Sequence, residues 1–218
     1  MNCPRTAGVV ADRHRSGLRS RVGIPPDVPI ALYQGMFYPH RGLENLVEAA
    51  RAFRRAHLVF MGWGVLLDAL RDLVRERGVA DRVRFTEGVP MGELLSFTAG
   101  ADVGLIPYRN VGLNNYYTSP NKLFEYCAAG VPVAASRFPE LTRIVEGMEI
   151  GRTFDPERPE EIAAAVNAIV DDPSEHARYH ANAVAAGRQF TWEIESKKLI
   201  EVYASLERSP EKRLEKEG

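Results

Sequence analysis

Several common features are scarce or missing in this 218-residue sequence, and each absence excludes a class of protein. Two cysteines, Cys3 and Cys127, are too few for a disulfide-stabilised scaffold. No apolar run reaches the roughly 18 residues of a membrane span, and no apolar signal-peptide core follows residue 1. With 28 basic and 29 acidic residues, the basic excess of nucleic-acid-binding domains is also missing. We therefore expect a cytoplasmic protein without a nucleic-acid partner; a peripheral membrane contact is left open.

What the sequence does contain is a regular alternation of apolar strands and amphipathic helices. Strands that are almost entirely apolar are typical of a parallel sheet covered by helices on both faces. The sequence therefore predicts an α/β fold: a Rossmann-like, doubly wound parallel sheet of about six strands, followed by three C-terminal helices. The strand segments are IALYQG (30–35), HLVFMG (57–62), RVRFTE (82–87), DVGLIPY (102–108), VPVAAS (131–136) and IGRTF (150–154).

The two ends of the sequence differ in composition from this α/β region. Residues 1–15 lack periodicity, and we interpret them as a linker or the remnant of a missing N-terminal domain. Residues 209–218 are mostly charged and are expected to form a solvated tail. The predicted domain is therefore 16–208.

Candidate ligand-binding residues follow the strands, because doubly wound sheets bind ligands beyond the carboxyl ends of their strands. In the segment G-W-G, Gly62 and Gly64 could let backbone N–H groups approach a phosphate, although a plain tight turn explains them equally well. Glu87 ends the next strand, so an NAD-binding fingerprint is an alternative. Leu67, however, occupies the place of its third glycine.

Basic residues stand at two predicted helix starts. Arg41 precedes the helix that begins near residue 43, and Lys122 lies in the first turn of the helix that begins at Asn121. A cation at the positive end of a helix is unfavourable unless an anion is bound there, although Arg41 could simply point into water. Glu125 could accept hydrogen bonds from paired sugar hydroxyls, or merely compensate the helix dipole. Several such junctions at one sheet edge favour a phosphate-bearing ligand.

The order and spacing of five segments resemble the C-terminal domain of retaining glycosyltransferases of family 4. The segments are G-x5-RG-LxxLVxA (35–49), LVFMGWG (58–64), VRFTEGVPxxEL (83–94), ADVGLIPY (101–108) and SPNKLFEYCAAGVPV (119–133). Such enzymes have the GT-B fold, in which two Rossmann-like domains enclose the active site. The resemblance implies that this chain is the half that binds the nucleotide-sugar donor.

The resemblance also implies roles for individual residues. Glu125 matches the second acid of the family's paired-glutamate motif, which holds the ribose hydroxyls, and Arg41 and Lys122 would be the catalytic cations that stabilise the leaving diphosphate. The other residues implied in donor binding are Gly35, Gly62, Trp63, Gly64, Glu87, Val89, Asn121 and Leu123.

Two positions depart from the family pattern. The first acid of the pair, eight residues before Glu125, is replaced by Tyr117. That acid contacts the transferred sugar in the family, so we expect the sugar contact to be built differently here, from Asn114, Asn115, Tyr116 and Tyr117. Met36 replaces a polar or basic residue that helps to hold the diphosphate.

The resemblance implies transfer of a glycosyl group from a nucleotide-diphosphate sugar to an acceptor hydroxyl, with retention of configuration. The acceptor would be bound by a missing N-terminal domain, and the isolated donor half would be inactive. Neither a metal nor another cofactor is expected. Two alternatives stay open: an NAD-dependent oxidoreductase domain, and a non-catalytic module that binds nucleotide sugars.

Overall fold

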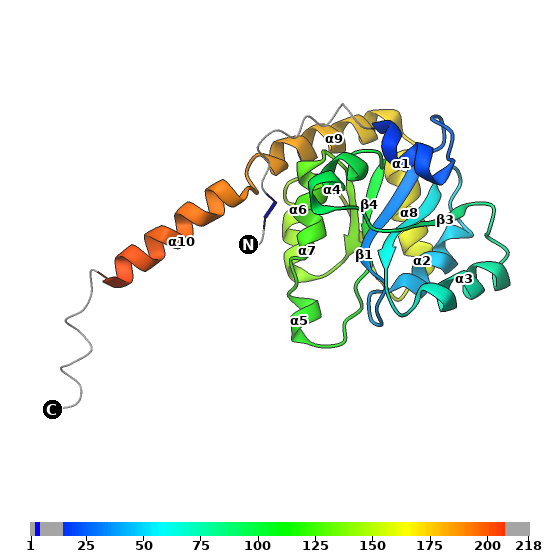
Figure 1. Cartoon of the computed structure of the whole chain (residues 1–218), viewed down its shortest axis with the longest axis horizontal. Helices are drawn as coiled ribbons and strands as arrows, with labels where there is room; N and C mark the ends of the chain where they lie inside the picture. Colours follow the sequence, from blue (N-terminus) through cyan, green and yellow to red (C-terminus); the bar gives the residue numbers. More distant parts are fainter. Residues whose placement is uncertain (1–2, 5–14, 208–218) are drawn as a thin grey trace.

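A six-stranded parallel sheet forms the centre of the computed structural model, which describes residues 3–4 and 15–207 (Figure 1). The strand order is β3-β2-β1-β4-β5-β6, and every neighbouring pair is parallel. The order reverses between β1 and β4, which is the switch point where doubly wound sheets bind ligands. The predicted fold class is confirmed. The strands are β1 (Ile30–Met36), β2 (His57–Trp63), β3 (Val83–Thr86), β4 (Val103–Ile106), β5 (Val133–Ser136) and β6 (Gly151–Phe154).

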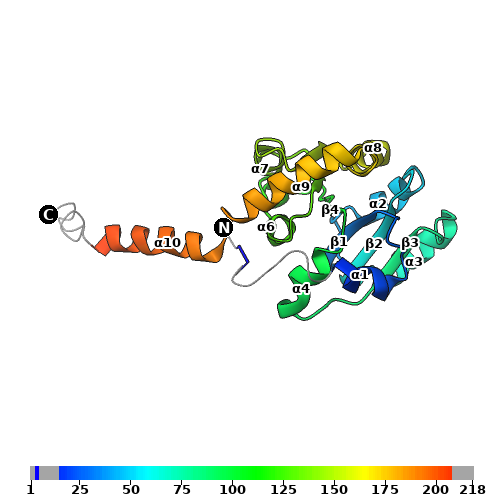
Figure 2. The same ribbon diagram turned by 90° about the horizontal axis from the view of Figure 1, so that it is seen from above.

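Helices cover both faces of the sheet (Figure 2). Apolar side chains of α2, α3 and α8 pack on one face, and those of α1, α4, α6 and α7 on the other. The helices of the described ranges are α1 (Arg15–Val22), α2 (Leu43–Ala50), α3 (Leu67–Glu76), α4 (Met91–Thr98), α5 (Leu113–Tyr116), α6 (Asn121–Ala128), α7 (Pro139–Val145), α8 (Pro159–Val170), α9 (Pro173–Gly187) and α10 (Trp192–Glu207).

The C-terminal helix and the limits of the described residues bear on the domain boundaries that the sequence predicts. Helix α10 extends away from the body of the chain, with exposed apolar side chains such as Ile200 and Tyr203 (Figure 1). No helix in the part of the chain that the structure covers is both long and apolar enough to cross a bilayer. Most of the predicted linker, 1–15, and all of the predicted tail, 209–218, lie outside the described residues.

Helix α6 is seated on the sheet by one aromatic side chain. The ring of Tyr126 lies against Gly104 of β4, where a Cβ atom would collide with it. The Tyr126 hydroxyl donates to the Leu32 carbonyl of β1 at 2.9 Å, so the only polar atom of this buried side chain is satisfied. Tyr126 thereby fixes α6 across the β1–β4 switch point. The polar residues at the start of α6 consequently lie at the carboxyl edge of the sheet.

The same edge contains an unusually close approach between two backbones. Gly35 of β1 pairs with Gly62 of β2, and a Cβ atom on Gly62 would overlap the Gly35 carbonyl oxygen. A Cβ atom on Gly64 would likewise overlap the backbone of Phe37. The Phe37 N–H donates to the Trp63 carbonyl oxygen at 2.7 Å. Both glycines also have φ of 153°, which other residues rarely adopt. They therefore hold the strand ends together.

We expect Gly62→Ala to destabilise the fold by roughly 2–5 kcal/mol, because it combines a steric overlap with backbone strain. Gly78→Ala is the matched control: Gly78 has φ of 67°, but no atom lies within 4 Å of the place that a Cβ would take, so only strain of about 1–2 kcal/mol applies. Urea unfolding of both variants measures the difference. Equal losses of unfolding free energy in the two variants would show that the close approach of Gly62 to the Gly35 carbonyl does not affect stability.

Candidate functional site

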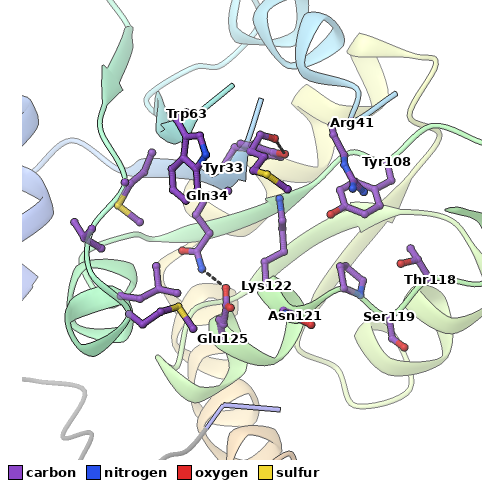
Figure 3. Close-up of a pocket in the computed structure, with 18 of the residues that line it drawn as sticks. Tyr33, Gln34, Arg41, Trp63, Tyr108, Thr118, Ser119, Asn121, Lys122 and Glu125 are labelled. Carbon is purple, nitrogen blue, oxygen red and sulfur yellow. Dashed lines mark hydrogen bonds between the residues drawn. The ribbon is translucent and has the colours of Figure 1, made fainter. Parts of the chain in front are cut away.

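A cavity of about 580 Å³ opens at the carboxyl edge, above the β1–β4 switch point (Figure 3). Its walls come from β1, the end of β2, the loops that follow β1, β3 and β4, helix α4, the segment before α6 and the start of α6. The lining residues are Tyr33, Gln34, Gly35, Met36, Arg41, Met61, Trp63, Gly88, Val89, Met91, Leu94, Tyr108, Asn114, Thr118, Ser119, Pro120, Asn121, Lys122 and Glu125.

A chain of hydrogen bonds fixes the one carboxylate in this lining. The Gln34 side-chain amide donates to Glu125 Oε2 at 2.6 Å (Figure 3). The Gln34 amide oxygen lies 2.7 Å from the Thr98 hydroxyl. Gln34 and Thr98 are buried, whereas Glu125 keeps part of its surface open. Burial raises the pKa of Glu125, and the Gln34 bond and the Lys122 charge counteract this. Gln34 therefore holds one oxygen of the carboxylate, and Glu125 lines the cavity.

Lys122 carries its amine into the cavity without a carboxylate or carbonyl partner. Its Nζ lies 3.7 Å from the centroid of the Tyr33 ring and 5.4 Å from that of Tyr108. This amine makes no hydrogen bond or ion pair within the described ranges, and the residue is only 7% exposed. Burial, and secondly the charge of Arg41, lower the pKa of Lys122 well below its ordinary value. Attraction to aromatic faces is what offsets this burial.

Arg41 is held in the same manner at the start of α2. Its guanidinium carbon lies 4.3 Å from the centroid of Tyr108, so Tyr108 supports both cations. The Tyr108 backbone is itself anchored, because the buried Ser136 hydroxyl lies 2.7 Å from the Tyr108 carbonyl oxygen. An aromatic ring carries no net charge, so it positions a cation without neutralising it, whereas a carboxylate would neutralise the cation. The Arg41 guanidinium and the Lys122 amine thus both face the cavity, and neither has a carboxylate partner within the described ranges.

The start of α6 adds further positive potential. The residue before the helix, Pro120, provides no side-chain cap, and the first turn contains no acid. With Lys122, Arg41 and an uncapped helix start in one place, the cavity has the electrostatics of an anion-binding site.

The opposite end of the cavity is apolar. Trp63, 60% exposed, lies against Gly88, where a Cβ atom would collide with the indole ring. Val89, Met91 and Leu94 continue this wall. A flat aromatic ring such as a nucleobase fits such a surface, because stacking and burial both favour it.

The sequence model of the family described as glycosyl transferases group 1 matches residues 15–186. The chain belongs to the group 1 glycosyltransferases. A GDP-mannose-dependent alpha-(1-6)-phosphatidylinositol monomannoside mannosyltransferase of Mycobacterium tuberculosis is 33% identical over 211 residues, which is 89% of this chain and 53% of that protein. The chain spans about half the length of the curated relatives it matches.

Solved structures of glycosyltransferases share the fold of this group 1 domain. Sucrose-phosphate synthase from Thermosynechococcus elongatus superimposes with a TM-score of 0.79 at 25% identity, over 94% of this chain and 51% of that chain. An Anabaena protein, Alr3699/HepE in complex with UDP-glucose, gives 0.75 at 19% identity, over 88% and 52%. The predicted architecture, one half of a GT-B fold, is confirmed.

The structure of this glycosyltransferase domain brings most of the predicted site residues together. Both predicted cations, Arg41 and Lys122, line the cavity, although the close aromatic support of each was not foreseen. Among the predicted donor-binding residues, those that also line it are Gly35, Trp63, Val89, Asn121 and Glu125.

Five residues implied by the resemblance lie outside the cavity lining: Gly62, Gly64, Glu87, Leu123 and Tyr117. Gly62 and Gly64 pack against the end of β1 and its following loop, so they shape the edge rather than line the cavity. This placement removes the main support for the dinucleotide fingerprint. Glu87 is exposed beyond β3, and the side chain of Leu123 is fully buried in the core beneath α6.

Tyr117 is 58% exposed and lies outside the lining, because α5 turns the loop so that other polar residues face inward. Asn114, Thr118 and Ser119 line the cavity instead. Sequence reasoning missed Gln34, whose signal was a polar residue inside an otherwise apolar strand. It also missed the position of Thr118 and Ser119, for which the sequence offered no periodic signal.

No group of three His, Cys, Asp or Glu side chains arranged to hold a metal occurs among the residues the structure describes. His176 and His180, four apart on α9, each lie against a backbone carbonyl instead. The distances are 3.0 Å to Asp102 O and 2.6 Å to Gly130 O. These contacts with backbone carbonyls explain the placement of both histidines on α9.

We expect Lys122→Met to stabilise the domain by about 1 kcal/mol or more, or about 2–4 °C in Tm, because the buried charge disappears. The advantage should shrink as pH rises toward about 10.4, where a lysine in the unfolded chain also loses its proton. Lys198→Met on the exposed α10 is the control and should change stability little. Thermal unfolding between pH 7 and 10 measures both. A destabilised Lys122→Met would mean that the amine contributes net favourable contacts.

Proposed function

We propose that this chain is the donor-binding half of a glycosyltransferase active site. The whole enzyme would move a glycosyl group from a nucleotide-diphosphate sugar to an acceptor hydroxyl, the acceptor being held by a further domain. One observation carries the proposal: two cations held on aromatic faces stand beside one hydrogen-bonded carboxylate in a cavity with an apolar end. The cations suit a diphosphate, the carboxylate suits the ribose hydroxyls, and the apolar end suits a nucleobase.

In this proposal, the ribose hydroxyls bind Glu125. Hydrogen bonds to a carboxylate are stronger than those between neutral groups, at about 1.5–3 kcal/mol each. Because Gln34 already occupies one oxygen of Glu125, the carboxylate has a fixed orientation before the ligand arrives. The base would then lie toward Trp63 and Val89.

The diphosphate would bind over Lys122, Arg41 and the start of α6. Charge develops on the leaving diphosphate when the glycosyl bond breaks, and fixed positive groups stabilise that charge more than they stabilise the ground state. These two cations are our reason for expecting no metal cofactor. Retention of configuration stays a prediction from the family resemblance.

The transferred sugar would face Asn114, Thr118 and Ser119. These amide and hydroxyl groups can both donate and accept hydrogen bonds, whereas the acid usual in the family would only accept. Sugar recognition in this chain is thus proposed to rest on neutral side chains.

Calorimetric titration with UDP, GDP, ADP and NAD tests the proposal. We expect one nucleoside diphosphate to bind, and Glu125→Ala to weaken it about 10- to 100-fold through loss of the charged hydrogen bonds. Glu76→Ala is the control, because Glu76 ends α3 at the opposite edge of the sheet and should leave the affinity unchanged. Binding of NAD alone would overturn the proposal in favour of an oxidoreductase.

The aromatic support of Arg41 can be tested in the same assay. Tyr108→Leu removes the ring under both cations, and we expect nucleotide affinity to fall about 2- to 30-fold. Tyr108→Phe keeps the ring face and should bind like the unaltered chain. Equal affinities for the Leu and Phe variants would show that the ring does not position the cations.

A further inference from the structure

We propose that binding of the donor diphosphate is coupled to uptake of one proton by Lys122. The residue would be a neutral amine in a substantial share of the free domain and an ammonium in the complex. This inference rests on the proposed function, because the diphosphate supplies the negative charge that retains the proton. It goes further by assigning a protonation change to the binding step.

The first argument is the poor solvation of the Lys122 ammonium. An ammonium ion has three N–H donors and is stable when water or acceptors bind them. Here the residue is only 7% exposed, its amine lies over the faces of Tyr33 and Tyr108, and the described part of the chain offers it no hydrogen-bond acceptor. Loss of the proton relieves the cost of burying a charge without such partners.

The second argument is the set of charges around the amine. Arg41, from the start of α2, repels the ammonium, and Glu125, one turn further along α6, attracts it. Burial weakens this attraction because it raises the pKa of the Glu125 carboxyl, whereas the hydrogen bond from Gln34 favours the charged carboxylate. Tyr33 of β1 and Tyr108 after β4 stay uncharged, since burial raises the pKa of both. Burial and the nearby Arg41 charge together outweigh the attraction of Glu125 and favour the neutral amine.

A bound diphosphate reverses this balance. Its oxygens accept hydrogen bonds from the ammonium and bring negative charge between Lys122 and Arg41. One N–H bond forms on Nζ with a proton taken from the buffer, and no other covalent bond changes. The complex therefore holds more protons than the free partners. Affinity should consequently fall as pH rises, by up to about tenfold per pH unit between the pKa values of Lys122 in the free and bound states.

Titration calorimetry in buffers with different heats of ionisation counts the proton. UDP-glucose and GDP-mannose are suitable probes, because a sugar-linked diphosphate lacks the terminal phosphate ionisation that lies near about pH 6 in monoesters. In HEPES, imidazole and Tris at one pH, we expect the observed enthalpy to increase with the buffer's heat of ionisation. The expected slope corresponds to uptake of up to about one proton.

Three variants assign the proton to its residue. Lys122→Arg keeps a cation that does not titrate, so binding should persist with a slope near zero. Lys122→Met should lose the slope and most of the affinity. Glu125→Gln removes the carboxyl group of the cavity lining, so affinity should fall while the slope remains. A slope that survives in Lys122→Arg, or disappears in Glu125→Gln, would overturn the assignment.

A second measurement needs no variant to fold. The other lysines of the chain are at 197, 198, 212 and 216, outside the strands and helices that build the cavity. In the domain with ¹³C- and ¹⁵N-labelled lysine, we expect the Cε and Nζ resonances of Lys122 to titrate well below the ordinary lysine value of about 10.4. Added donor should move this midpoint upward. Titration of Lys122 together with the other lysines would overturn the inference.

The results separate this inference from the proposed function. Donor binding with no buffer dependence rejects proton uptake and leaves the donor site intact. Failure of UDP-glucose, GDP-mannose and the free nucleotides to bind rejects the proposed function, and proton uptake with it.

Discussion

The burial of the Lys122 amine at the carboxyl edge of the sheet is the constraint to which the rest of the site is adapted. Helix α6 must lie deep on the sheet for this amine to reach β1, and Tyr126 achieves that by packing on Gly104. The end of β1 leaves room for the amine at Gly35. Even a Cβ atom on Gly35 would lie in ordinary contact with Nζ, at 3.5 Å. Tyr33 and Tyr108 then provide the faces on which the amine rests.

An ordinary ion pair would bury this lysine with less electrostatic cost, but it would also neutralise the charge that a phosphate ligand needs. The structure uses aromatic rings instead, and it occupies the nearest acid, Glu125, with Gln34. Sites that must bind a charged ligand commonly sacrifice stability in this way, because groups prepared for the ligand are poorly satisfied without it. The cavity is thus preorganised at the expense of the free fold.

The sequence was sufficient for the strands, because each is a short apolar run that only a covered parallel sheet explains. It was also sufficient for Glu125, Arg41 and Lys122, whose spacing from helix starts placed them at one edge. Gln34 could not be found in this way, since its partners Thr98 and Glu125 lie 64 and 91 residues away along the chain. Only the completed fold brings such residues together.

The glycines show a different limit of sequence reasoning. A Gly-x-Gly segment after a strand indicates that a backbone must come close to something, but not what that partner is. In this domain the partner is the neighbouring strand and its following loop. Likewise, Tyr117 and Thr118 are adjacent in sequence, and the short helix α5 decides which of them faces the cavity.

Most cations of this chain are arginines, yet the one that is buried among the residues the structure describes is a lysine. An arginine would stay charged in the empty cavity, whereas a lysine can give up its proton and an amine lone pair becomes free. A free amine lone pair is a nucleophile. Lys122 should therefore react with amine-directed acylating reagents faster than the exposed lysines of α10, and a bound donor should protect it, which turns the cavity into a place for selective covalent labelling.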